Sequence, residues 1–139
     1  ELKKAEQERY LTAYSSALLK VFDKVYRLDY ENGMAEVLHT NRSDDMKIKE
    51  HYYFRDFFQR FSKMISVTNG AEADAFQVLE SKDVLDQRLA ESDNGWYERT
   101  YHFTPPRGKT QTISALIFKI ELEANHEEYL CCMKKRLPH

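Results

Sequence analysis

The strongest constraint on the fold is a stretch in the C-terminal third of the chain that is apolar on both faces of a predicted strand. Residues 96–123 read WYERTYHFTPPRGKTQTISALIFKIELE, which predicts two strands joined by a Pro/Gly turn. In the second strand one face carries Ile113, Ala115 and Ile117, and the other carries Leu116, Phe118, Ile120 and Leu122. A strand of this kind usually lies inside a sheet with elements packed on each side. We therefore expect it at the centre of a sheet, with Leu116 and Phe118 away from open water.

Length and charge exclude several classes of protein. A chain of 139 residues most simply forms one domain. Its formal net charge of -2 gives no electrostatic case for binding nucleic acid or an anionic membrane. No apolar run approaches the roughly 18 residues that span a bilayer. The two cysteines, Cys131 and Cys132, are adjacent and suggest no disulfide framework, so we expect a reduced, cytoplasmic protein.

The order of predicted elements indicates an α+β fold. Asn32-Gly33 favours a hairpin turn because both positions of that turn need positive φ. The predicted elements are a helix over 1–18, a hairpin over 19–40, a loop over 41–50, helices over 51–66 and 71–92 separated by a break at 67–70, strands over 96–103 and 110–123, and a helix over 126–137. We expect an antiparallel sheet, with helices inserted between the N-terminal hairpin and the C-terminal strands and packed mainly on one sheet face.

This order resembles the PAS fold, and three stretches carry the likeness. ERYLTAYSSALLKVFDKVYRLDY, WYERTYHF and LIFKIELEANHEEY are similar to the PAS domains that precede bacterial diguanylate cyclases and histidine kinases. The chain departs from that pattern in two ways. It has Lys119-Ile120-Glu121 where many such domains end their last strand with Asp-Ile-Thr, and it is one strand short unless 84–90, which predicts a helix, supplies it.

The resemblance implies a sensory or dimerisation input module of a multidomain bacterial signalling protein, with a regulatory and not an enzymatic role. Residues 1–18 would form a flanking helix that joins two copies as a homodimer, 19–123 the PAS-like domain, and 124–139 an outgoing helix. The chain begins at Glu1 inside an apparent helix, so we expect an excised piece whose covalently linked output domain lies outside it.

Aromatic residues are the candidates for a ligand site between the inserted helices and the sheet. The predicted pocket residues are Tyr53, Phe54, Phe57, Phe58, Trp96, Arg99, Tyr101 and Phe103. Tyrosine hydroxyls and Arg99 would orient a small polar ligand, since a buried polar group needs a partner. The alternatives are that the rings simply fill the core and that Arg99 pairs with a carboxylate such as Glu98.

No pattern in the chain predicts a metal, a cofactor or a catalytic residue. The five histidines are scattered, and no His/Cys spacing matches a zinc site. The four glycines all fall in predicted turns, which leaves no phosphate loop and no G-x-S-x-G. The flavin-photosensor branch of the PAS family needs an Asn-Cys-Arg-Phe motif that is absent, and His51 is a poor candidate for a haem ligand.

Two other functions stay open. The first is a pure protein-interaction domain with a filled core, which would form a stable dimer without a small ligand. The second is a small α+β cone of the nuclear-transport-factor type, an enzyme or carrier with a deep pocket and a convergent acid and histidine. Glu98 and His102 fall on one face of a predicted strand, which is the only support for that reading.

Overall fold

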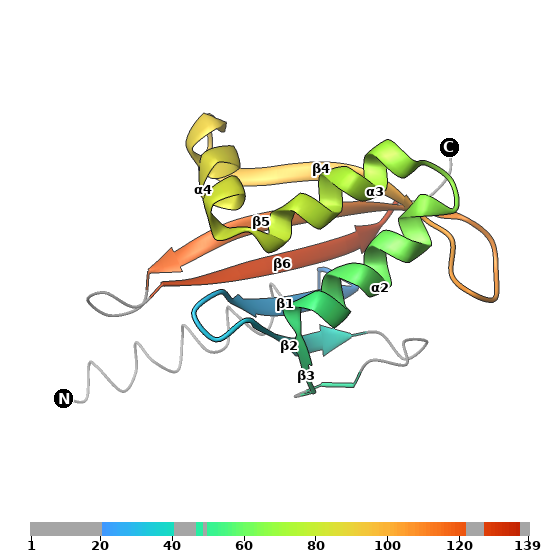
Figure 1. Ribbon diagram of the computed structural model, residues 1–139, viewed down its shortest axis with the longest axis horizontal. Helices are drawn as coiled ribbons and strands as arrows, with labels where there is room; N and C mark the ends of the chain where they lie inside the picture. Colours follow the sequence, from blue (N-terminus) through green and yellow to red (C-terminus); the bar gives the residue numbers. More distant parts are fainter. Residues whose placement is uncertain (1–20, 41–46, 49, 122–126, 137–139) are drawn as a thin grey trace.

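The computed structural model describes residues 21–40, 47–48, 50–121 and 127–136, which form one six-stranded antiparallel sheet. The strand order across the sheet is β3-β2-β1-β6-β5-β4 (Figure 1). The strands are β1 Lys24–Asp29, β2 Met34–Thr40, β3 His51–Tyr53, β4 Trp96–Phe103, β5 Gln111–Glu121 and β6 Glu127–Lys135. The N-terminal hairpin and the C-terminal strands thus meet where β1 pairs with β6.

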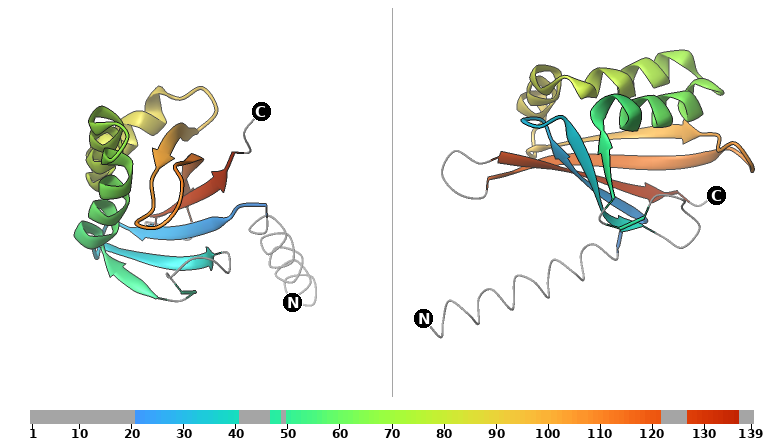
Figure 2. Two further views of the ribbon diagram at one scale, coloured as in Figure 1. Left: turned by 90° about the vertical axis from the view of Figure 1, so that its right-hand side faces the viewer. Right: turned by 60° about the horizontal axis from the view of Figure 1, so that its bottom comes forward.

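The inserted helices all lie on one face of this sheet, as the two turned views show most clearly (Figure 2). They are α2 Phe54–Ser66, α3 Gly70–Gln77, the short 3-10 turn η1 Val78–Glu80 and α4 Lys82–Glu91. The break at 67–70 arises because Asn69 caps α3, its Oδ1 accepting a hydrogen bond from the Glu72 N–H at 3.1 Å. The predicted α+β class, the antiparallel sheet and the position of the helical insert are confirmed.

The predicted hairpin is also confirmed, with a longer turn than the dipeptide Asn32-Gly33 alone would give. Asp29 pairs with Met34, so four residues connect the strands. The Asp29 carboxylate accepts hydrogen bonds from the N–H groups of Glu31 and Asn32, at 3.1 and 3.2 Å. Gly33 then closes the turn at φ 65°, a conformation that other residues seldom adopt.

The predicted C-terminal helix is wrong, because residues 127–135 form strand β6. In EEYLCCMKK the apolar residues Tyr129 and Met133 stand four apart, which suits a helix, but Tyr129, Cys131 and Met133 also alternate, which suits a strand. A short apolar run cannot be assigned by periodicity alone. This strand supplies the one that the chain seemed to lack, and 84–90 is helical as predicted. The boundary between a domain at 19–123 and an outgoing segment at 124–139 therefore does not hold.

The position of the two-faced apolar strand needs a correction as well. It is β5, and it lies second from the β4 edge, whereas β1 and β6 form the middle of the sheet. Ile113, Ala115 and Ile117 are buried under the helices, but Leu116 and Phe118 on the opposite face are only half-buried. Neither side chain stands in open water, so the expectation of a covered second face is met only in part. The predicted flanking helix at 1–18 lies outside the described residues.

Candidate functional site

The structure divides the eight predicted pocket residues into a buried group and an exposed group. Phe54, Phe57, Phe58, Tyr101 and Phe103 belong to the core cluster between the helices and the sheet. Tyr53 is 68% exposed in the short strand β3, Trp96 is 41% exposed at the start of β4, and Arg99 is exposed on β4. Tyr53 is exposed and Phe54 is buried because the boundary between β3 and α2 falls between them: Tyr53 ends the strand and Phe54 begins the helix. Ligand binding by the eight residues stays a prediction.

The buried group packs ring against ring. Phe61 on α2 is the most connected: its ring centroid lies 5.7 Å from Tyr26, 5.1 Å from Phe57 and 5.4 Å from Phe103, each in an edge-to-face arrangement. Such geometry places the positive edge of one ring on the negative face of the next. The rings therefore hold α2 and α3 on the sheet.

Among the described residues, the hydroxyl of Tyr101 is a buried polar atom in this aromatic core without a hydrogen-bond partner. The hydroxyl of Tyr101 belongs to a side chain of zero exposure, and among the described residues nothing meets it at hydrogen-bond geometry. Burial raises the pKa of Tyr101 far above its ordinary value. The Tyr97 side chain raises that pKa further, because it lies near the hydroxyl although outside hydrogen-bond geometry. The guanidinium carbon of Arg99 lies 5.8 Å from the centre of the Tyr101 ring. An unpaired buried hydroxyl costs about 1–3 kcal/mol, so the Tyr101 hydroxyl destabilises the fold as it stands.

Other polar side chains fasten the helices to the sheet. Tyr30 donates its hydroxyl hydrogen bond to the carbonyl of Leu79 at 2.6 Å. Tyr129, on β6, donates to Oδ1 of Asp86 on α4. Glu72, 9% exposed on α3, accepts from the backbone N–H of His102, and its Oε1 also lies 3.1 Å from the His102 Nδ1. The sequence analysis did not single out Asp86 or Glu72. Glu72 lies four residues before Phe76 and so on the same face of α3, a position that indicated a glutamate turned toward the core.

Glu72 also protects an edge of the sheet. Among the described residues β4 pairs with β5 alone and so forms an edge of the sheet, where unpaired N–H groups can attract another strand. We expect Glu72→Ala to lower the free energy of unfolding by about 1–3 kcal/mol, because the His102 N–H loses a charged acceptor. Urea unfolding measures the loss, and hydrogen exchange of the His102 amide should accelerate. Asp74→Ala, an exposed carboxylate of the same helix, should change stability by no more than about 0.5 kcal/mol; an equal loss there would contradict the role of Glu72.

The two cysteines are unpaired, and both are buried. They are consecutive in a strand, so their side chains point to opposite faces of the sheet. Burial raises the pKa of Cys132 to about 12 and that of Cys131 further, and the adjacent Cys132 also raises the latter. Thiols held protonated in this way are poor nucleophiles and metal ligands at neutral pH.

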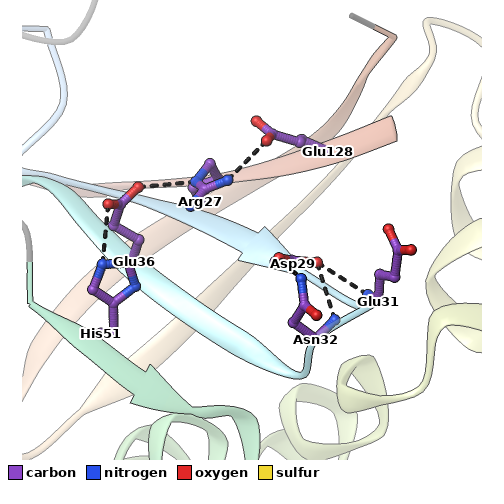
Figure 3. A network of polar contacts seen from close by, with 7 residues as sticks. All are labelled: Arg27, Asp29, Glu31, Asn32, Glu36, His51 and Glu128. Carbon is purple, nitrogen blue, oxygen red and sulfur yellow. Dashed lines mark hydrogen bonds and ion pairs between the residues drawn. The ribbon is translucent and has the colours of Figure 1, made fainter. Parts of the chain in front are cut away.

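A charge network crosses the sheet on the face away from the helices (Figure 3). Arg27 on β1 stands between two carboxylates, with Nε 2.9 Å from Glu36 and an Nη 2.8 Å from Glu128. His51 approaches the second oxygen of Glu36 at 3.3 Å. The network ties β6, β1, β2 and β3 together, and the two carboxylates raise the pKa of Arg27 against the opposing effect of its partial burial. Each charged side chain of the network has a partner on a strand of the sheet, which indicates a structural role.

The acid and histidine proposed for a cone-type enzyme do not converge. Glu98 and His102 stand four positions apart on β4, which separates them by about 13 Å along a strand. Glu98 faces Arg136 at 3.5 Å, and His102 faces Glu72. Among the described residues, no group of three or more His, Cys, Asp or Glu side chains gathers in a way that could hold a metal ion. The helices of the described segments are also too short or too polar to cross a bilayer.

Comparisons with known proteins add little to this geometry. No family profile matches the sequence, and no curated protein matches it. Among solved structures, the chain is similar to the PAS domain of an HTR-like protein from Haloarcula marismortui, with 15% sequence identity and a TM-score of 0.37 over 95% of this chain and 99% of that one. A likeness this distant carries no argument about the function of this chain.

Proposed function

We propose that the chain is a PAS-like sensory input module, regulatory and not catalytic, that binds a small anionic molecule between its inserted helices and its sheet. The observation that carries the proposal is the buried Tyr101 hydroxyl, which has no hydrogen-bond partner at the described residues. The exposed Arg99 guanidinium, whose carbon lies 5.8 Å from the centre of the same ring, supplies a positive charge nearby. A carboxylate reaching inward from Arg99 would satisfy the hydroxyl and remove its desolvation cost.

Binding at this position requires the rings around Tyr101 to separate, because Phe76 and Phe103 already pack against it at centroid distances of 5.4 and 6.4 Å. The ligand would thus shift α3 relative to β4. The output of that shift would pass through the sheet, since the C-terminal segment 127–135 is strand β6 and not an outgoing helix. Coupling of about 1–3 kcal/mol between the two states is typical of such devices.

A protein-interaction domain with a filled core is the second candidate, and the ring packing favours it. The cluster around Phe61 already makes edge-to-face contacts with Tyr26, Phe57 and Phe103. In that case the chain would act through homodimer formation, and we keep the proposal that the segment 1–18 supplies the dimer contact.

Tyr101→Phe separates the two candidates. We expect it to raise the free energy of unfolding of the empty chain by about 1 kcal/mol, because it removes an unpaired buried polar group. It should also abolish any thermal shift that the original chain shows with a panel of small mono- and dicarboxylates. Tyr30→Phe, which removes the same atom from a tyrosine whose hydroxyl donates to the Leu79 carbonyl, serves as the control for nonspecific effects on the melting temperature.

Native mass spectrometry of the purified chain gives the independent reading, because it reports bound small molecules and dimer mass together. A bound organic acid that is lost in Tyr101→Phe supports the sensor. A dimer without any bound molecule and without a carboxylate thermal shift supports the interaction domain. An empty monomer contradicts both.

A further inference from the structure

A groove opens beside the aromatic core, among the described residues. Its volume is about 1400 Å³, and it lies between α2, the loop that joins β4 to β5, and the sheet end where β1 begins and β6 finishes. In Figure 1 this loop, drawn in orange, projects beside the C-terminal end of α2. The predicted pocket residues other than Phe103 do not line it. Ligand pockets for single small molecules usually occupy about 300–1000 Å³, so the groove suits a longer occupant.

The floor of the groove is apolar. It contains Phe61, Phe103, Ile113 and Met133, all of them core residues with only their outer surfaces on the groove. Met64 and the Pro105-Pro106 pair extend this surface toward the loop. Apolar side chains of an occupant would be removed from water here, which favours binding.

The rim of the groove is positively charged, although the whole chain carries a net charge of -2. Of the described side chains that line it, five are basic and three are acidic, and the basic ones come from three directions. Arg60 and Lys63 stand on α2, Arg107 on the loop, and Lys24 and Lys135 at the strand ends. One of the three acids, Asp23, accepts a hydrogen bond from the backbone N–H of Lys135 at 2.6 Å. The local surplus of positive charge attracts an acidic occupant.

We propose that this groove binds an extended peptide segment in which acidic residues alternate with apolar ones. Side chains of an extended chain point alternately to opposite sides, so one set can reach the apolar floor while the other set meets the basic rim. The bound segment would lie against both β1 and β6, which the Asp23–Lys135 hydrogen bond joins at this end. The site is separate from the Tyr101 position and does not depend on the proposed function.

The test uses the whole chain and a short fluorescein-labelled peptide in which glutamate alternates with leucine, followed by fluorescence anisotropy. The groove variant is Lys63→Glu with Arg107→Glu. Its matched control is Arg55→Glu with Lys109→Glu, which makes the same change of net charge in the same helix and the same loop at exposed residues that do not line the groove. We expect the groove variant to weaken binding at least about fivefold and the control variant to leave it within about twofold.

Two further measurements complete the test. Binding should weaken when sodium chloride rises from about 50 to about 300 mM, because the rim charges are exposed to screening. The same peptide with lysine in place of glutamate should bind at least about tenfold more weakly. The proposal is overturned by equal losses in the two variants, by equal binding of the lysine peptide, by absence of binding to a chain that is folded by circular dichroism, or by full displacement of the peptide by octanoate at equal concentration, which would indicate a site for small amphiphiles.

Discussion

Replacing Phe61 by alanine is expected to lower the free energy of unfolding by about 3–5 kcal/mol, the usual cost of removing a buried phenylalanine ring. Phe61 is 2% exposed and contacts rings from β1, α2, α3 and β4, so its loss leaves a cavity at the point where the helices meet the sheet. Single domains are stable by about 5–15 kcal/mol, so this change removes a large share of the total. Urea unfolding followed by circular dichroism measures it.

Tyr53→Ala provides the control, because it removes a ring of similar size from a residue that sequence patterns place in the same pocket. Tyr53 is 68% exposed, and we expect a change within about 0.5 kcal/mol. Comparable losses at the two positions would contradict the division of the predicted pocket into core and surface. A loss of less than about 1 kcal/mol for Phe61→Ala would show that the ring cluster is not what holds the helices on the sheet.

Local signals in the sequence account for the elements that were predicted correctly. Asp29 and Gly33 act within the hairpin turn itself, and Asn69 acts within the first turn of α3, so the residues that determine each structure are neighbours in the chain. The strand at 96–103 was predicted with its observed bounds because its aromatic residues alternate along eight positions between two turns. The order of the elements then limits the topology to an antiparallel sheet with an inserted helical layer.

The wrong predictions concern segments whose secondary structure or place in the sheet is decided by tertiary packing. The segment 127–135 has apolar residues compatible with either period, and pairing with β1 and β5 selects the strand. The same pairing moves β5 away from the middle of the sheet, which its two apolar faces had suggested. Leu116 and Phe118 show why the pattern misled, since half-burial on the second face is enough to favour apolar residues there.

The candidate site was harder to predict than the fold. Aromatic residues at helical and strand spacing indicate where the core lies, but their pattern does not say whether the rings leave room for a ligand. The unpaired hydroxyl of Tyr101 depends on the positions of α3 and β4 together, and the groove depends on α2, a loop and two strand ends. Properties that involve several elements become visible only once the elements are placed.

A second large effect is expected where α4 is fastened to the sheet by Asp86 and Tyr129. The Tyr129 side chain is buried, and its hydroxyl donates to Asp86, which also lies 2.8 Å from the Lys82 ammonium. Asp86→Ala should lower the free energy of unfolding at neutral pH by about 1–3 kcal/mol, because the buried hydroxyl loses its acceptor. Gln87→Ala, at an exposed position of the same helix, should stay within about 0.5 kcal/mol.

The pH dependence gives this contact a distinct signature. Partial burial alone would raise the pKa of Asp86, but hydrogen bonds from Lys82 and Tyr129 outweigh it and hold that pKa below its ordinary value. A carboxyl group with a lowered folded-state pKa stabilises the fold above its unfolded pKa of about 3.9, and the stabilisation disappears as the pH falls through the folded value. The difference in stability between the original chain and Asp86→Ala should therefore shrink between about pH 5 and about pH 2.

At alkaline pH the same pair responds in the opposite direction. Burial raises the pKa of Tyr129 to about 12, and the hydrogen bond to Asp86 raises it as well. The stabilisation from this hydroxyl is present below its unfolded pKa of about 10 and is lost as the pH rises toward 12.

Adding Tyr129→Phe to Asp86→Ala should restore part of the lost stability, because it removes the unpaired hydroxyl. Additive losses in this double-mutant cycle would mean that the two side chains stabilise the fold independently, and the contact between α4 and β6 would then lie elsewhere.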